Sequence, residues 1–176
     1  MRKVVLFIAM SLDGFIAGAN GGVDWLRGQA DDAETEDTYS AFVKTVDTVI
    51  MGWTTYHQVR TELSPSEWVY GNLMTYVVTH REQASTENIR FVHESPSELV
   101  RRLRNGDGKD IWVCGGASVV QQLMEDGLID RFHLSIIPTI LGSGIRLFGP
   151  SPAEARLKLV ENRNSNGIIE VIYEKR

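Results

Sequence analysis

Runs of apolar residues recur along this chain and are separated by polar, glycine-containing connections. Several of these runs are rich in β-branched and aromatic side chains and lack strict alternation. Such runs are typical of strands that are covered on both faces of a sheet. The predicted strands cover residues 3–10, 46–52, 73–79, 89–93, 110–116 and 130–141.

Apolar positions at helical spacing lie between these predicted strands. One helix is predicted to contain Tyr39, Phe42, Val43 and Val46, and a short helix follows at residues 53–59. Two more helices are predicted later in the chain. The first has Ser95 as its N-cap and Pro96 at its first helical position, and the second ends at Gly127.

The last part of the chain has a different pattern. Two alternating runs flank the Asn-Ser-Asn-Gly sequence at residues 164–167, which is the signature of a β-hairpin. Strands and helices that alternate before a terminal antiparallel hairpin predict a three-layer α/β fold with a mixed sheet. No repeat or interdomain linker is evident, so residues 1–176 are predicted to form a single domain.

Charge and cysteine content narrow the classes of partner. The net charge is −5 with no basic patch, which argues against nucleic acid or an anionic membrane as the main partner. The apolar run at residues 3–10 is too short for a secretory signal, so a cytoplasmic protein is expected. A single cysteine and four histidines without ligand spacing predict no metal site.

The Gly115-Gly116 pair lies where a predicted strand passes into a predicted helix. A helix N-terminus offers unpaired amides to an anion, and glycine lets the backbone approach it closely. The pair therefore suggests a pyrophosphate site, although two glycines also suit a tight turn that binds no ligand. The spacing is neither that of a Rossmann G-x-G-x-x-G motif nor that of a Walker loop.

Five motifs lie in order along nearly the whole chain: IAMSLDGFIAG, VDTVIMGWTTYHQV, YVVTHR, IWVCGGASVVQQLMEDGLIDRFHLSIIP and LGSGIRLF. Together they resemble the dihydrofolate reductase superfamily. The resemblance is closest to the branch related to the C-terminal reductase domain of the bifunctional riboflavin-biosynthesis deaminase-reductase. It implies a mainly parallel mixed sheet flanked by helices, and it implies NADPH as the cofactor.

The resemblance also implies positions for the parts of NADPH. Ala9 and Ile16 are expected to frame the nicotinamide, and Trp25 is expected to close the loop over it. Residues expected near the phosphates and the adenosine are Gly52, Thr54, Thr55, Thr79, His80 and Arg81. The pyrophosphate is expected at Gly115, Gly116, Ala117, Ser118 and Val119.

One position departs from the pattern of the superfamily. Many dihydrofolate reductases have an arginine or lysine after the glycine that ends the second strand, whereas this chain has Trp53 after Gly52. The cation that would pair with the 2′-phosphate is therefore expected to be Arg81.

The residues that would act on a substrate are less clearly indicated. Dihydrofolate reductases use one carboxylate after the glycine-rich loop, and the corresponding region here contains six acidic residues. Asp32 is the first candidate and Asp24 the second, with a solvated acidic helix start as the alternative. Ser135 matches a position where the superfamily often has a hydroxyl beside the substrate. A basic cluster for a ribose phosphate is not found near the first predicted helix, where Lys44 is the only close cation.

Two functions follow from these observations. The first is an NADPH-dependent reductase that transfers hydride to a small heterocycle, either a pteridine of the dihydrofolate type or a pyrimidine of the riboflavin pathway. The second is a nucleotide-binding module of the same fold that has lost catalysis. The resemblance also implies a homodimer as the assembly.

Overall fold

The computed structural model describes residues 1–31, 33, 36–150 and 154–176, and their main feature is one large sheet. Its eight strands in the described residues lie in the order β5-β4-β3-β6-β1-β7-β10-β9. The first six in this order run parallel, whereas β10 pairs antiparallel with both β7 and β9. This confirms the predicted mixed, mainly parallel sheet. The strands are β1 (Val4–Ser11), β3 (Val46–Gly52), β4 (Met74–Val78), β5 (Ile89–Val92), β6 (Asp110–Gly115), β7 (Arg131–Ile137), β9 (Leu157–Ser165) and β10 (Ile168–Lys175).

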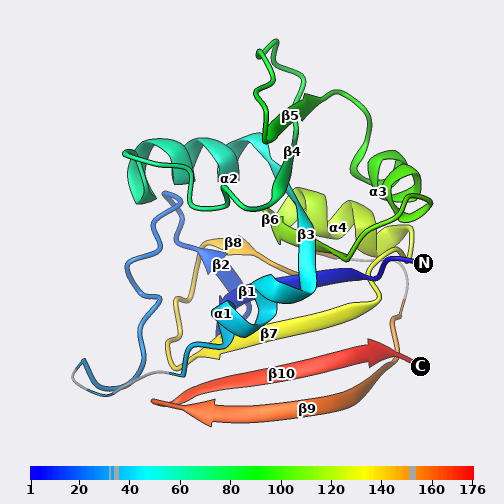
Figure 1. Cartoon of the computed structure of the whole chain (residues 1–176). Coiled ribbons are helices and arrows are strands. Elements are labelled where there is room, and N and C mark those ends of the chain that lie inside the picture. Colours follow the sequence, from blue (N-terminus) through cyan, green and yellow to red (C-terminus); the bar gives the residue numbers. More distant parts are fainter. Residues whose placement is uncertain (32, 34–35, 151–153) are drawn as a thin grey trace.

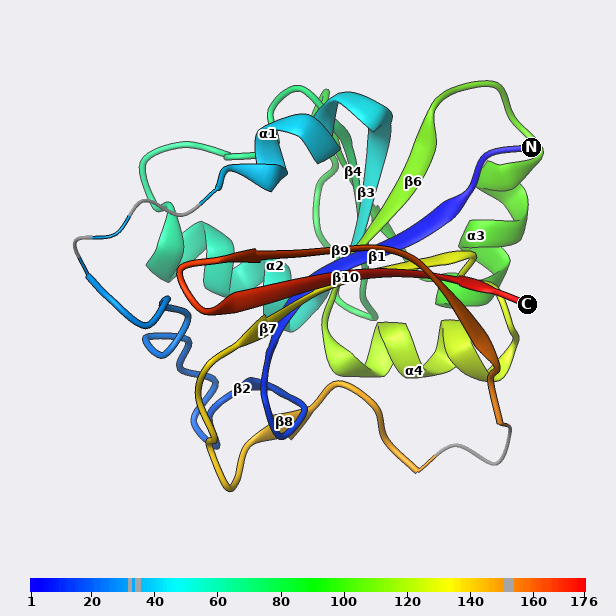
Figure 2. The same ribbon diagram turned by 90° about the horizontal axis from the view of Figure 1, so that it is seen from below.

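Helices cover both faces of the parallel part of the sheet, which gives the three layers that the sequence predicts. Side chains of β1 alternate between the faces: Leu6 packs with α3 (Pro96–Arg104) and α4 (Ala117–Glu125). Val5 packs on the other face in the cluster that contains Phe42 of α1 (Thr38–Phe42). Figure 2 shows α1 and α4 on opposite sides of the central strands.

The helix around Phe42 is shorter than the sequence predicts. The α-helix ends at Phe42, one 3₁₀ turn spans Val43–Thr45, and Val46 is the first residue of β3. Val46 pairs with β6 and is buried, so its burial in the sheet outweighs its place in the helical pattern. The next helix, α2 (Trp53–Gln58), starts directly at the carboxyl end of β3 and continues into a π-helical turn at Val59–Leu63.

The C-terminal hairpin forms as predicted. Asn166 and Gly167 both have positive φ angles, +51° and +75°, as the two central residues of a type I′ turn require. This turn connects β9 with β10, which lie at one edge of the sheet in Figure 1.

A second, two-stranded sheet lies in segments that the sequence predicts as loops. It pairs β2 (Phe15–Ala17) with β8 (Ile145–Arg146). Gly144 has a φ of +146°, and a Cβ on it would lie 2.2 Å from the carbonyl oxygen of Ala17. Glycine is therefore required where the two segments meet.

Asp13 connects the segments that contain β2 and β8 through hydrogen bonds. Its carboxylate accepts hydrogen bonds from the Ser11 hydroxyl at 2.6 Å and from the amides of Leu141 and Gly142 at 3.1 and 2.8 Å. The Ser11 bond is the main reason that the pKa of Asp13 falls to about 2. Asp13 therefore holds the loop before β8 against the end of β1.

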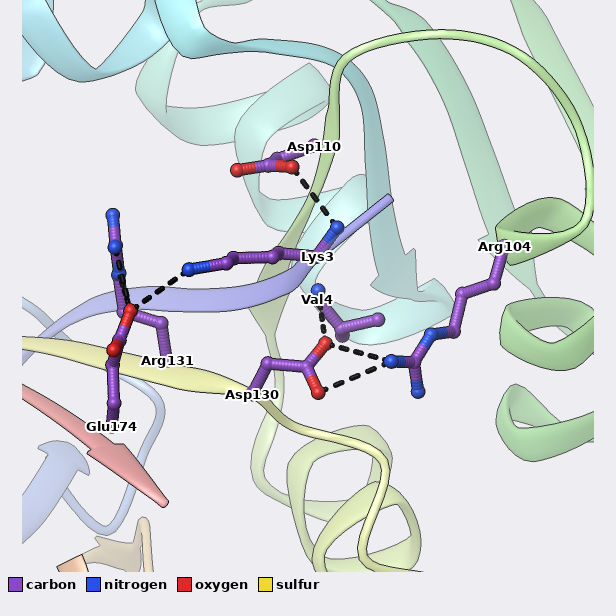
Figure 3. A network of polar contacts seen from close by, with 7 residues as sticks. All are labelled: Lys3, Val4, Arg104, Asp110, Asp130, Arg131 and Glu174. Atoms are coloured by element: carbon purple, nitrogen blue, oxygen red, sulfur yellow. Dashed lines mark hydrogen bonds and ion pairs between the residues drawn. The ribbon is translucent and has the colours of Figure 1, made fainter. Parts of the chain in front are cut away.

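A network of charged residues connects the amino ends of the parallel strands β1 and β7 with the carboxyl end of the antiparallel strand β10 (Figure 3). Asp130 accepts a hydrogen bond from the Val4 amide at 2.8 Å. The Arg104 guanidinium donates to both carboxylate oxygens of Asp130, at 3.1 and 3.2 Å. Glu174 of β10 pairs with Lys3 at 3.0 Å and with Arg131 at 2.6 Å. These contacts connect β1, β7, β10 and α3 far from the carboxyl ends of the parallel strands.

Asp130→Ala is expected to lower the free energy of unfolding by about 1–3 kcal/mol, because it leaves the amide of a buried residue without its acceptor. Val4 is fully buried. Urea denaturation of Asp110→Ala provides the control, since Asp110 accepts the exposed amide of Lys3 at 3.0 Å. Equal midpoints for the two variants would contradict this role of Asp130.

Candidate active site

A cleft lies at the carboxyl ends of β1, β3 and β6, between the first turns of α2 and α4. Its volume is about 570 Å³. Among the described residues, its lining contains no Asp, Glu, Lys or Arg, so it presents no fixed negative charge to an anion. The predicted cofactor residues that line it are Ala9, Ile16, Gly52, Thr54, Thr55, Thr79, His80, Gly116, Ala117, Ser118 and Val119.

The Gly115-Gly116 pair forms the connection between β6 and α4. Gly115 has a φ of +128°, Gly116 is the N-cap of α4, and the peptide bond between them is cis. Because glycine has no side chain, Gly116 cannot cap the first amides of the helix. The amides that open α4 at Ala117 and Ser118 are therefore available at the cleft, where the helix dipole favours an anion.

Gly52 and Gly116 allow the end of β3 to approach α4 closely. A Cβ on Gly52 would lie 3.4 Å from the Val119 side chain, and a Cβ on Gly116 would lie 3.3 Å from the Thr55 hydroxyl. The cleft is therefore narrow between Thr55 and Gly116, and a larger side chain at either glycine would fill it.

Arg81 lies beside the cleft rather than in its lining. Its guanidinium carbon is 5.0 Å from the centre of the Trp53 ring, which is a cation–π distance. Both residues line a neighbouring hollow of about 430 Å³ that shares Trp53, Thr54 and Gln58 with the cleft. The Arg81 cation thus lies at the outer end of the cleft.

Trp25 and Gly115 lie next to the cleft lining. The indole of Trp25 donates to the Gly22 carbonyl at 3.2 Å, and its neighbours Val23 and Leu26 line the cleft. Gly115 precedes the lining residue Gly116 in the chain.

A second, smaller cavity opens on the other side of Ala9. Its volume is about 260 Å³, and it shares Ala9 and Leu26 with the cleft. Its lining combines apolar and polar side chains, which alternate along β7 and β10. The lining residues are Phe7, Ala9, Leu26, Glu36, Asp37, Thr38, Tyr39, Ser135, Ile137, Arg163, Ser165, Ile168 and Glu170.

Glu170 of β10 is a carboxylate of this lining that other polar lining residues contact. Its side chain is only 14% exposed. It accepts hydrogen bonds from the Thr38 hydroxyl at 2.6 Å and from the Ser135 hydroxyl at 3.3 Å. Strand register explains the second contact, because Glu170 pairs directly with Ser135 across β10 and β7.

His133 lies behind Glu170, with its Nε2 3.4 Å from the carboxylate. Its ring packs edge-on against Phe7, with 4.6 Å between the centroids. Burial lowers the pKa of His133, although the negative charge of Glu170 opposes this shift. The imidazole is therefore largely neutral at pH 7, and the charge of Glu170 is not balanced by a cation at this position.

The sequence predicts three residues on the substrate side, Ser135, Asp24 and Asp32, and the outcome differs for each of them. Ser135 lines the smaller cavity and contacts Glu170. Asp24 is exposed in the loop before Trp25 and is not part of the lining of either cavity. Asp32 lies outside the described residues, so the structure says nothing of it.

The sequence prediction did not include Glu170, because it placed the substrate-side carboxylate after the glycine-rich loop. Glu170 lies in an alternating apolar strand, where an inward-facing acid is unusual. That exception to the pattern was the available signal, but only the pairing of β10 with β7 shows that the side chain meets Ser135.

Cys114, the only cysteine in the sequence, lines the cleft. Its Sγ lies 3.9 Å from the Tyr70 hydroxyl, and burial raises the pKa of the thiol to about 11. Cys114 is therefore a protonated wall residue of the cleft.

Among the described residues, no three His, Cys, Asp or Glu side chains gather as metal ligands. In the same part of the chain, no helix has the length and apolar character needed to cross a bilayer.

Comparison with known proteins extends these observations. The sequence profile of the RibD C-terminal domain matches residues 2–169. The uncharacterized protein YwjB of Bacillus subtilis (strain 168) is 38% identical over 173 residues, which are 98% of this chain and 97% of YwjB.

Two crystal structures share the fold. A protein of Shewanella sp. PV-4 that is provisionally named for riboflavin biosynthesis has a TM-score of 0.86 at 22% identity, over 99% of both chains. The diaminohydroxyphosphoribosylaminopyrimidine deaminase/5-amino-6-(5-phosphoribosylamino)uracil reductase of Thermotoga maritima has a TM-score of 0.70 at 18% identity. The match covers 99% of this chain and 57% of the Thermotoga chain. These two structures show a shared fold, and the profile match shows that the chain belongs to the RibD C-terminal domain family.

Proposed function

We propose that this protein is an NADPH-dependent reductase of a small heterocyclic substrate. The observation that carries the proposal is the position of Ala9, which is shared by the cleft and by the smaller cavity. A nicotinamide against Ala9 would face the hydrogen-bonded group of Glu170, Thr38 and Ser135. Such an arrangement suits a reaction in which cofactor and substrate must meet face to face.

The residues of the cleft fit a dinucleotide. The uncapped amides at the start of α4 suit a pyrophosphate, and the glycines leave room for its oxygen atoms. Ile16 and Ala9 offer an apolar surface to the nicotinamide ring. Trp53 suits the adenine, and Arg81, which lies over its ring, would pair with a 2′-phosphate.

NADPH supplies a hydride from its nicotinamide ring when it is bound. The protein's own residues orient the substrate and exclude water. Phe7 and Ile137 form apolar walls of the smaller cavity, while Glu170 and the hydroxyls bonded to it fix the polar edge of the substrate.

Titration with NADPH, followed by tryptophan fluorescence, tests the proposal. Saturable quenching is expected because Trp53 lines the cleft. The loss of absorbance at the nicotinamide band is then followed with dihydrofolate and with a ribosylaminopyrimidine. Failure of NADPH to bind would contradict the proposal. Binding without turnover on any pteridine or pyrimidine would instead favour a nucleotide-binding module of the same fold.

Arg81→Ala is expected to weaken NADPH binding by about tenfold, because one charge-assisted contact to the 2′-phosphate is lost. The affinity for NADH, which lacks this phosphate, should change little. Fluorescence titrations of both nucleotides measure the difference, and Arg90→Ala is the control because Arg90 is an exposed residue outside both hollows. An equal loss for NADPH and NADH would contradict the role of Arg81.

A further inference from the structure

The smaller cavity has a charge distribution that bears on its ligand. Its described lining contains three carboxylates, Glu36, Asp37 and Glu170, and one cation, Arg163. This surplus of negative charge lies around a space of only about 260 Å³. Glu36, Asp37 and Arg163 are exposed, so water screens their charges, whereas Glu170 is only 14% exposed and its charge acts on a ligand more strongly than it would in water.

The carboxylate of Glu170 is held in place by groups that do not neutralise it. Thr38 and Ser135 donate from hydroxyls to the same oxygen, Oε1. The other oxygen, Oε2, has His133 at 3.4 Å, which is a long contact for a hydrogen bond. Because an ionised carboxylate can accept about four hydrogen bonds, Glu170 has capacity to accept from a ligand.

The cation of the lining is already engaged. Arg163 contacts Glu36 at 3.0 Å and Glu161 at 2.7 Å. Glu161 is the main reason that the pKa of Arg163 is raised, and the charges of Glu36 and Glu170 add to this shift. A ligand phosphate would have to compete with these carboxylates for the one cation of the described lining while lying near Asp37.

We propose that this cavity binds a compact planar substrate that is neutral or cationic, donates N–H groups to Glu170, and carries no phosphate. The inference rests on the proposed function only in taking the bound molecule to be the substrate. Its reason is electrostatic: a ring nitrogen or an exocyclic amine gains a charge-assisted bond from Glu170, whereas a phosphate meets a surplus of like charge.

Ligand-binding measurements on the NADPH-saturated full chain test this inference. The probes are 2,4-diaminopyrimidine, which donates N–H groups, pyrimidine, which has none, and ribose 5-phosphate. Calorimetry is expected to detect binding of the diaminopyrimidine and to detect neither of the other two at equal concentration. Tighter binding of ribose 5-phosphate, or equal binding of pyrimidine and diaminopyrimidine, would overturn the inference.

Glu170→Gln is expected to weaken binding of the diaminopyrimidine by at least about tenfold, because it removes the charge and keeps the shape. Glu174→Gln is the matched control: it lies on the same strand but outside the cavity lining, and the affinity should not change. Equal affinity in wild type and Glu170→Gln would overturn the inference. If Glu170→Gln does not fold, the three-probe comparison on the wild type decides alone.

The cofactor titration separates this inference from the proposed function. NADPH binding that is intact while the diaminopyrimidine fails to bind overturns the substrate class and leaves the cofactor site standing. If NADPH fails to bind, the proposed function fails, and the same probes on the free protein still decide what the cavity accepts.

Discussion

Gly116→Val is expected to weaken NADPH binding by at least about 100-fold, which corresponds to about 2.7 kcal/mol of binding free energy. The Cβ of any residue at this position would lie 3.3 Å from the Thr55 hydroxyl, inside the narrow part of the cleft. The two methyl groups of valine would extend further into the space proposed for the pyrophosphate. The φ of Gly116 is −79°, which valine can adopt, so the loss would come from occupation of the site rather than from backbone strain.

Gly106→Val is the matched control for this variant. Gly106 is exposed and follows α3, and a Cβ there would meet only the Leu103 carbonyl at 3.6 Å. Fluorescence titration should give the wild-type affinity for this variant, and circular dichroism should show that both variants are folded. Wild-type affinity in folded Gly116→Val would mean that the double glycine serves only as a turn.

Trp112→Ala is expected to lower the free energy of unfolding by about 3–5 kcal/mol, the usual cost of removing a buried aromatic side chain. Trp112 is 4% exposed and donates its indole N–H to the Phe7 carbonyl at 3.0 Å. Its ring also meets Phe42 and Tyr70 edge-on, with centroids 5.6 and 5.1 Å apart. It therefore connects Phe7, in the lining of the smaller cavity, to the core.

Trp25→Ala serves as the comparison in urea denaturation of the unliganded protein. Trp25 is half-buried, and its indole donates to Gly22 within the same loop, so a change within about 1 kcal/mol is expected. If the two variants unfold at the same urea concentration, Trp112 does not have the structural role assigned to it.

The sequence predicted most of the sheet because buried parallel strands leave a direct pattern. The run VDTVIMG corresponds residue for residue to β3, and the Asn166-Gly167 turn was predicted by its residue types. The pairing of β2 with β8 was not predictable, because it joins segments about 130 residues apart and depends on the close approach at Gly144. The pattern around Val46 was ambiguous, since a valine suits a buried strand as well as a helix face.

The cleft and the smaller cavity also differ in how far the sequence could predict them. The cleft lies at strand ends, where ligands gather in open α/β sheets, and the sequence pattern alone suggested a ligand site at Gly115-Gly116. Gly52 and Thr79, which also line the cleft, were indicated only by the resemblance to the dihydrofolate reductase superfamily. The smaller cavity depends on register and on long-range contact. Glu170 meets Thr38 across more than 130 residues, and no local pattern connects them.

A crystal structure of the protein with NADPH tests the central claim most directly. The account predicts the nicotinamide against Ala9, facing Glu170, and the pyrophosphate at the amides of Ala117 and Ser118. The adenosine 2′-phosphate should lie within contact of Arg81. NADPH bound elsewhere, or bound with its adenine against Ala9, would contradict the account.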